Sequence, residues 1–594
     1  MTVYREEKAW LLVYTRKPLS DYPEGLARSV HFAYRRDGEE YQALHQNYGI
    51  LFAEAEISQE DTIVPKGVRN PRIFQLPEGG YGILADRTAE DGGPETDRTA
   101  CRGDLAADGL GKAAGGYALL WTTRDFREFA KPVLLEKAGA EWEVLRRMAG
   151  EGVPGTYLVE GELVTGSSME IGSSLCDRIV QKWTQVHNTE IRLPGVVHAS
   201  AEEDIRAVRA RAVYSDGSTA MKKVLWDMEG IDFGVPGTYQ VTGKVCSRKF
   251  AFPLLTGYGD PVVFLWEGKW YFLGTNDNRN DIGIYVREAD SVEGLFSRET
   301  EEQLILGVDE EKGFVQTFWA PEFHVIGGRL YILFAVGGKV WGPQCHMMRL
   351  KPGGHIADPG SWEEPVKVVR KDGGLLSTDG ITLDMTYLDT GERSYLVWSY
   401  RRGIGTPGDT GSMLYIAEAD ETEPWRLAGG PVLLSRPLFG WENLAGTINN
   451  EGPHGFTRDG KVYLTYSGGA ANGYTYVLGL LEANGKDCLT DPAAWKKSRV
   501  PVLSFYSVKG EYGPGHNSFY TDEDGNLMIA YHGETSLESD LRCDGIRRVH
   551  FDIQGEPVFD MSPERDLNPA LTEVKLRVVV RGEDMSSRNR KENI

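Results

Sequence analysis

The sequence predicts an all-β protein with several domains. It contains 71 Gly, 27 Tyr, 21 Phe and 14 Trp among 594 residues. Short apolar segments alternate with turns of Gly, Asp and Asn, a pattern typical of strands joined by tight turns. A chain of this length exceeds what one hydrophobic core usually serves, so we expect about two to four domains.

The charge balance argues against two classes of partner. The chain has 65 Lys and Arg against 87 Asp and Glu, a net charge of −22. Such an acidic surface repels nucleic acid and anionic membranes.

The apolar run near the N-terminus is too short for a signal peptide, which predicts a cytoplasmic protein, or a secreted one if a signal segment has been removed. The six cysteines form no Cys-x-x-Cys pair, so we expect neither a zinc cluster nor a disulfide framework.

Five segments of the C-terminal part share one pattern. Each has an ionisable residue, a short strand, a Gly or Asp turn and a second strand rich in Tyr. The leading residues are Asp260, Glu322, Asp384, Glu451 and His516, separated by 62, 62, 67 and 65 positions. This period leaves room for four strands per unit, which predicts a five-bladed β-propeller.

The first strands of propeller blades line the central channel, so these ionisable residues are expected near one channel mouth. Acidic residues before strands are often turn formers that face solvent, but five at matching positions favour a shared pocket. Crowded carboxylates raise one another's pKa and separate into a proton donor and a proton acceptor. That separation suits glycoside hydrolysis.

Four motifs carry a resemblance to a known family. They are Gly-Asp-Pro at 259–261, Trp-Ala-Pro-Glu at 319–322, Asn-Glu-Gly-Pro-His at 450–454 and Gly-Pro-Gly-His-Asn-Ser at 513–518. With them, residues 248–580 resemble glycoside hydrolase family 43. The members are five-bladed propeller enzymes that act mostly on α-L-arabinofuranosides and β-xylosides.

The resemblance implies an inverting mechanism with three acids. Asp260 matches the general base and Glu451 the general acid. The third acid, which orients the general acid, falls in the third repeat. Asp384 lies 11 positions before Tyr395 and Asp379 lies 16 before it; the corresponding spacing in the first repeat is 11, so Asp384 is expected in this role.

The resemblance also implies further site residues. Those expected to bind substrate are Glu322, Trp319, Asn450, Asp379 and His454. His516 matches a histidine that in many members binds calcium, often through water, and no organic cofactor is expected. Arg547 or Arg548 is expected to reach the sugar, and spacing does not choose between them.

Residues 1–165 contain hairpins from Ser29 and from Asn70 that look like blades of a second, partial propeller. Asn70-Pro71 stands where Asp260-Pro261 stands in the other, and Asn cannot act as a base. We therefore expect a noncatalytic domain. Open blade edges predict that it packs against another domain or, in an oligomer, a second subunit.

Residues 166–247 are expected to form a linker and a small module that resembles a bacterial immunoglobulin-like domain, on the strings Tyr-Ser-Asp-Gly-Ser and Gly-Thr-Tyr-x-Val-x-Gly. We expect it to act as a spacer or brace between the propellers. Residues 581–594 are expected to form a polar tail.

The resulting hypothesis is an inverting exo-glycosidase that releases terminal furanose sugars from an oligosaccharide or small glycoside, with α-L-arabinofuranosidase as the first choice. β-D-galactofuranosidase and β-xylosidase on the same fold are alternatives. A noncatalytic sugar-binding propeller is the alternative from another class, and it would be favoured only if one of the three acids were missing.

Overall fold

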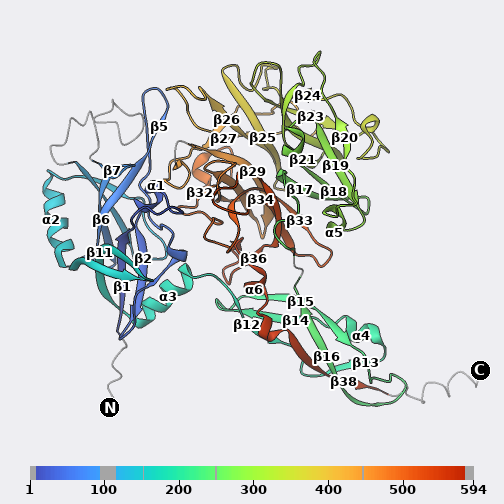
Figure 1. Cartoon of the computed structure of the whole chain (residues 1–594), viewed down its shortest axis with the longest axis horizontal. Coiled ribbons are helices and arrows are strands. Elements are labelled where there is room, and N and C mark those ends of the chain that lie inside the picture. Colours follow the sequence, from blue (N-terminus) through green and yellow to red (C-terminus); the bar gives the residue numbers. More distant parts are fainter. Residues whose placement is uncertain (1–7, 94–115, 152, 248–249, 445–446, 582–594) are drawn as a thin grey trace, which may run out of the picture. The chain divides into compact units, whose positions relative to one another are not determined.

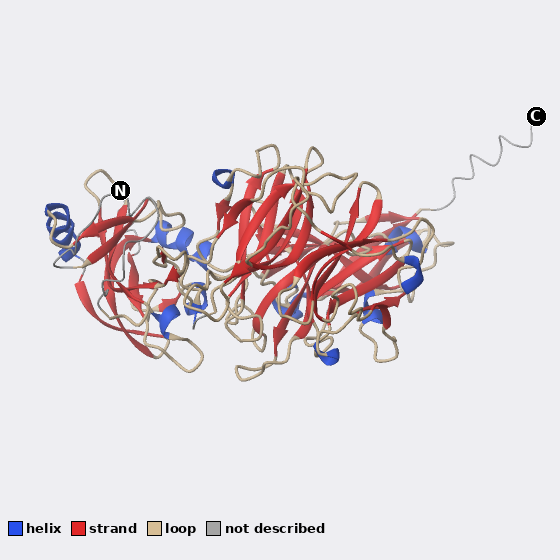
Figure 2. Cartoon of the chain, turned by 90° about the horizontal axis from the view of Figure 1, so that it is seen from above, coloured by secondary structure: helices blue, strands red, loops and turns tan. Residues whose placement is uncertain are grey.

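Strands dominate the protein, and its helices are short (Figure 2). The computed structural model describes residues 8–93, 116–151, 153–247, 250–444 and 447–581. Two compact units are present, namely Met1–Thr184 with Ala251–Ile546, and Gln185–Phe250 with Arg547–Ile594. Across the described ranges, no helix is both long and apolar enough to cross a membrane.

Five sheets of the first unit are the blades of a β-propeller, so the predicted fold is confirmed (Figure 1). The strands follow one another in chain order within each blade. Their bounds are β17 Gly259–Trp266, β18 Lys269–Thr275, β19 Ile284–Ala289 and β20 Gln303–Leu306; β21 Gln316–Ile326, β22 Arg329–Gly337, β23 Gln344–Arg349 and β24 Val366–Lys367; β25 Gly380–Asp389, β26 Ser394–Arg402, β27 Met413–Glu418 and β28 Val432–Ser435; β29 Asn450–Arg458, β30 Lys461–Gly468, β31 Val477–Asn484 and β32 Lys496–Lys497; and β33 Tyr512–Thr521, β34 Leu527–Glu534 and β35 Cys543–Arg548.

The fifth blade is completed by the segment that precedes the first. The backbone N–H of Leu254 donates to Asp544 O at 2.8 Å, and that of Gly257 donates to Arg542 O at 2.8 Å. Residues 254–257 thus lie along the outer edge of β35. This pairing joins the two ends of the propeller and leaves no open edge at the junction.

The first strand of every blade carries a bulge at the same place. At each bulge the register shifts and one residue has a positive φ. These residues are Asp260, Ala320, Asp384, Gly452 and His516, with φ of 58°, 44°, 52°, 55° and 33°. A left-handed backbone conformation costs free energy for most residues other than Gly. A bulge also changes the direction in which the neighbouring side chains point.

The five ionisable residues of the predicted repeat lie at different positions relative to the bulge. Asp260, Asp384 and His516 occupy the bulge position itself, whereas Glu322 lies two residues after it and Glu451 one residue before it. The five ionisable residues are therefore not strictly equivalent. A sequence spacing that varies between 62 and 67 hides this offset because loop lengths also vary.

The N-terminal region contains two sheets. One has the consecutive order of a blade and consists of β6 Lys66–Gln75, β7 Tyr81–Ala89, β8 Tyr117–Thr123 and β9 Val133–Glu136. Its first strand has the same bulge, with Asn70 at φ 52°. The other sheet has the order β10 Val153–Val159, β11 Glu162–Gly172, β1 Lys8–Thr15, β2 His31–Arg36 and β3 Gln42–Ala43. This second sheet is not a consecutive blade, and residues 166–172, expected in the linker, form part of it.

Short helices and two further strand pairs are also described; one pair is β36 His550–Phe551 with β37 Pro557–Val558. The other is a hairpin of β4 Glu56–Ile57 and β5 Ile63–Val64. The helices are α1 Glu24–Ala27, α2 Ala140–Met148, α3 Ser173–Trp183, α4 Glu202–Arg206, α5 Val292–Leu295 and α6 Pro563–Asp566. A Ser side chain at residue 291 caps α5 by accepting a hydrogen bond from Gly294 N, a common way to satisfy a free helix end.

The N-terminal region shares a hydrophobic core with the propeller. Tyr22 and Phe52 pack in one buried cluster with Trp441, Tyr466 and Phe505. A backbone hydrogen bond from Ala55 N to Leu438 O at 2.7 Å adds a strand-like contact. Both parts therefore form one folded unit, in which large aromatic side chains supply much of the buried area.

The second unit is built around a six-stranded sheet. Its order is β12 Asn188–Arg192, β14 Ala210–Tyr214, β15 Thr219–Asp227, β16 Gly237–Cys246, β38 Glu573–Val580 and β13 Val197–Ala199. The late strand β38 lies beside β16 (Figure 1) and pairs with it from Gly237 to Lys244. The expected propeller boundary at residue 580 is thus too late, because the chain returns to this sheet after the fifth blade.

Candidate active site

The three predicted acids lie on first strands of three blades, β17, β25 and β29. His516, on β33, connects them electrostatically. Its Nδ1 lies 3.0 Å from Asp260 Oδ1, and its charge lowers the pKa of both Asp384 and Glu451. The bulges thus bring residues from four blades into one site.

Asp260 is buried, with 7% of its surface exposed. Thr275 Oγ1 donates to Asp260 Oδ2, and Arg542 Nη1 donates to both carboxylate oxygens at 3.1 and 3.3 Å. Burial alone would raise the pKa of Asp260, but the charges of His516 and Arg542 outweigh it and hold the pKa well below its ordinary value. Asp260 is therefore ionised, as a general base must be.

Glu451 has the opposite tendency. Burial and the neighbouring charge of Asp384 raise the pKa of Glu451 to about 7, although His516 opposes the shift. Tyr476 OH donates to Glu451 Oε1 at 3.0 Å. A carboxyl group with this pKa keeps a proton near neutral pH, which suits a general acid.

Asp384 is hydrogen-bonded to β29, the strand that carries Glu451. Its Oδ2 accepts a hydrogen bond from Gly452 N at 3.1 Å and one from Ser399 Oγ at 2.9 Å. Burial raises the pKa of Asp384 and His516 lowers it, with a net rise. Asp379, the weaker candidate for this position, is exposed and accepts a hydrogen bond from Tyr400 OH at 2.8 Å.

His516 is paired with the candidate base. Burial would lower its pKa, but Asp260 outweighs burial and raises the pKa of His516 to about 9. The histidine thus forms an ion pair with the candidate base, and the calcium expected at His516 stays a prediction.

A second group of donors lies on β21 and β29. Glu322, His324 and His454 offer ligand atoms within 4.8 Å of one another. Two imidazoles and a carboxylate suit transition metals better than calcium, which prefers oxygen. However, His324 Nε2 and Glu322 Oε2 lie only 2.6 Å apart and share a hydrogen bond. This contact satisfies the carboxylate without a metal ion.

The expected substrate-binding residues differ in their surroundings. Glu322 is only 2% exposed and is engaged by His324, and burial lowers the pKa of His454 to about 4. Trp319 Nε1 donates to Asp281 at 2.9 Å. Asn450 is fully buried, and its side chain bonds to Ser435, Glu442 and Lys497. Asn450 therefore supports the strand and is not turned toward a ligand.

Arg542 was not singled out by the sequence, although it binds the candidate base. It also donates to Asp277 through Nε at 3.0 Å. Of the two arginines that were considered, Arg548 pairs with Asp566 at 2.6 Å within the second unit. An ion pair thus already holds the guanidinium of Arg548, and the expectation that Arg547 or Arg548 reaches the sugar stays a prediction.

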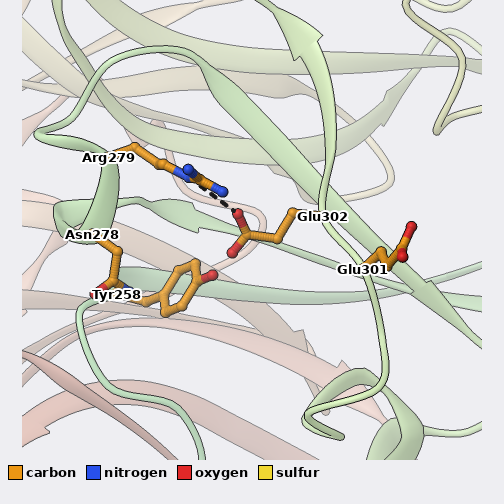
Figure 3. A pocket seen from close by; sticks show the side chains of 5 residues that line it. All are labelled: Tyr258, Asn278, Arg279, Glu301 and Glu302. Atoms are coloured by element: carbon orange, nitrogen blue, oxygen red, sulfur yellow. Dashed lines mark ion pairs between the residues drawn. The ribbon is translucent and has the colours of Figure 1, made fainter.

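An open pocket of about 530 Å³ lies on the first blade (Figure 3). Its lining residues are Tyr258, Asn278, Arg279, Glu301 and Glu302. Arg279 and Glu302 form an ion pair across it at 3.7 Å. None of the three predicted acids lines this pocket, so it is distinct from the acid site.

A five-bladed propeller that holds an ionised carboxylate and a protonated one in a single site defines the class of protein, a glycoside hydrolase. Residues 302–555 match the sequence profile of Glycosyl hydrolases family 43. The chain belongs to this family.

Several known proteins are similar to the chain. An "Extracellular exo-alpha-(1->5)-L-arabinofuranosidase" of Streptomyces avermitilis is 30% identical over 54% of this chain and 66% of its own length. "Alpha-L-arabinofuranosidase B" of Pyricularia oryzae is 31% identical over 49% of this chain and 54% of its own length. The chain therefore spans about two thirds and about half of these relatives. A crystal structure of an α-L-arabinofuranosidase from Lactobacillus brevis covers 52% of this chain and 95% of its own, with 27% identity and a TM-score of 0.45.

The relatives correct one expectation. A second relative, from Streptomyces chartreusis, is 29% identical over 58% of this chain and 97% of its own length. This protein and the Streptomyces avermitilis protein are both named extracellular. The cytoplasmic location predicted from the N-terminus is therefore wrong. The apolar content of the first residues was an insufficient basis for it.

Proposed function

We propose that the protein is an exo-acting, inverting α-L-arabinofuranosidase. The feature that carries the proposal is a pair of buried acids, on the first strands of the first and fourth blades, whose pKa values shift in opposite directions. The pKa of Asp260 is held well below its ordinary value, and that of Glu451 is raised to about 7. The names of the relatives support arabinofuranose as the sugar.

In the proposed reaction Asp260 accepts a proton from a water molecule as that water attacks the anomeric carbon. Glu451 donates its proton to the leaving oxygen on the opposite face of the sugar. Asp384 holds the backbone beside Glu451 through Gly452 N. No bond forms between enzyme and sugar, so the configuration at the anomeric carbon inverts.

The residues around Asp260 explain why it stays ionised in a buried site. Arg542 and His516 each contribute a positive charge within about 3 Å of its oxygens, and a buried carboxylate without such partners would take up a proton. A carboxylate with a low pKa is a weak base. Asp260 therefore assists the attack of water, while Glu451 activates the leaving group by protonating it.

The test is hydrolysis of three 4-nitrophenyl glycosides, the α-L-arabinofuranoside, the β-D-galactofuranoside and the β-D-xyloside. The highest kcat/KM is expected for the arabinofuranoside. The galactofuranoside has the same relative ring configuration with one added exocyclic carbon, which a hydrophobic contact discriminates only weakly. A preference for the galactofuranoside or xyloside would replace the proposed sugar, and no hydrolysis of any of the three would contradict the proposal.

A further inference from the structure

The hairpin β4–β5 of the N-terminal region carries an acidic residue at its turn. Asp61 has a φ of 68°, and Ser58 Oγ accepts hydrogen bonds from Glu60 N and Thr62 N at 3.2 Å each. These hydrogen bonds stabilise the turn. Its left-handed residue is Asp61, and Asp is one of the few residue types that tolerate this backbone conformation.

Two arginines of the propeller hold Asp61. Arg436 Nη1 lies 2.7 Å from Asp61 Oδ1, and Arg436 Nη2 donates to Asp61 O at 2.8 Å. Arg402 Nη2 lies 3.0 Å from Asp61 Oδ2. The side chain of Arg436 is 7% exposed and that of Arg402 is 38% exposed. Arg436 thus anchors the hairpin, while the side chain of Arg402 stays partly exposed to solvent.

Both arginines lie at the end of the blades where the first strands begin. Arg402 pairs with Gly380, four residues before Asp384 on β25. At about 3.4 Å per residue, the backbone of Arg402 lies about 14 Å along the strand from that of Asp384. Arg436 directly follows β28, on the connection that leads to Glu451. This backbone separation exceeds the length of one sugar ring.

An exposed acceptor lies beside this arginine. Asp379 precedes Gly380, and its Oδ1 accepts a hydrogen bond from Tyr400 OH at 2.8 Å. The neighbouring Arg401 is by contrast fully engaged, because it binds Asp409 through two nitrogens at 2.8 and 2.7 Å and Asn449 at 3.0 Å. Guanidinium donors next to carboxylate acceptors match the hydroxyl groups of a neutral sugar, which both donate and accept.

We propose that Asp61, Arg402 and Asp379 form a distal binding surface for the sugar units beyond the terminal furanose. Asp61 holds Arg402 in place, and Arg402 and Asp379 contact the sugar. The N-terminal region, which lacks an acid at Asn70, therefore contributes to the choice of substrate. This inference rests on the proposed function and deepens it.

The experiment compares Asp61→Asn and Arg402→Gln with the wild type on two substrates. One is α-1,5-linked arabinotriose, and the other is 4-nitrophenyl α-L-arabinofuranoside, which has no second sugar. We expect kcat/KM for the triose to fall about tenfold more than for the nitrophenyl glycoside, mainly through KM, as for the loss of a charge-assisted hydrogen bond. Glu60→Gln, at the exposed neighbouring position, is the matched control and should show no such difference.

An equal loss on both substrates, or no loss on either, would overturn the inference, because a residue that merely supports the fold affects both substrates alike. If melting shows that Asp61→Asn is poorly folded, Arg402→Gln decides the result. A wild-type protein that cleaves neither arabinofuranoside would instead contradict the proposed function. The two failures are therefore distinguishable.

Discussion

Gly452 donates its backbone N–H to the carboxylate of Asp384 at 3.1 Å, and Gly452 directly follows Glu451. Asp384, proposed to orient the general acid, thus acts through the peptide group next to Glu451. A left-handed φ of 55° at Gly452 brings this N–H to the carboxylate. A Cβ at this position would lie 2.7 Å from the His516 ring, so glycine is required.

The first prediction concerns Glu451→Gln. Loss of a general acid typically lowers the rate by about 10²–10⁴, and kcat/KM should fall by this factor on arabino-oligosaccharides. The loss should be much smaller on a 2,4-dinitrophenyl glycoside, whose leaving group needs no proton. Steady-state kinetics on both substrates checks this, and an equal loss on the two would speak against the acid role.

The second prediction concerns Asp260→Asn, which should lower kcat by about 10²–10⁴ on every substrate, because all of them require activation of water. The chain offers a matched control in Asn70→Asp, at the equivalent bulge of the N-terminal sheet. That change should leave the kinetics as they are. Near-normal turnover of Asp260→Asn would mean that another group is the base.

The third prediction is the pH profile of kcat/KM. Activity should fall as the pH rises through about 7, because Glu451, with its pKa raised to about 7, loses its proton. The acidic limb should lie below the ordinary carboxyl range, since the pKa of Asp260 is lowered.

The His516→Asn variant tests the sign of both shifts. His516 lowers the pKa of Asp260 and of Glu451, so its removal should move both limbs to higher pH by about one unit. His355→Asn, on an exposed residue that pairs with Glu288, is the control. If both limbs of the pH profile stay in place in His516→Asn, His516 does not carry the positive charge assigned to it.

The fourth prediction concerns the shared core. Tyr22 is fully buried, donates to His31 or accepts from it at 2.8 Å, and stacks on Tyr506 at 5.5 Å between centroids. Tyr22→Ala should destabilise the protein by about 3–5 kcal/mol, as for other large core truncations. Chemical denaturation should show the propeller and the N-terminal region unfolding together. Leu163→Ala, at a site 60% exposed, should have little effect, and separate transitions in the wild type would contradict the shared core.

Local pattern was enough to predict the blades and to favour Asp384 over Asp379 as the buried carboxylate beside Glu451. The spacing from Asp384 to Tyr395 matches that from Asp260 to Tyr271 because each hairpin has a bulge, two short strands and a tight turn. The offset of Glu451 from the bulge could not be read from spacing, since an adjacent glycine takes the strained φ in its place.

Contacts between distant segments were not predictable. Strand β38 reads as an ordinary alternating strand, and nothing local indicates that it pairs with β16, more than 300 residues earlier. Arg542 carries no motif, and its role depends on an ion pair with Asp260 across the junction of the propeller. The arginines that hold Asp61 are likewise separated from it by more than 300 residues.

The most direct test of the central claim is the configuration of the released sugar, followed by ¹H NMR in the first minutes of hydrolysis of 4-nitrophenyl α-L-arabinofuranoside. An inverting reaction with Asp260 as base and Glu451 as acid predicts that β-L-arabinofuranose forms first and then equilibrates. Initial release of the α-anomer would show retention and contradict the account.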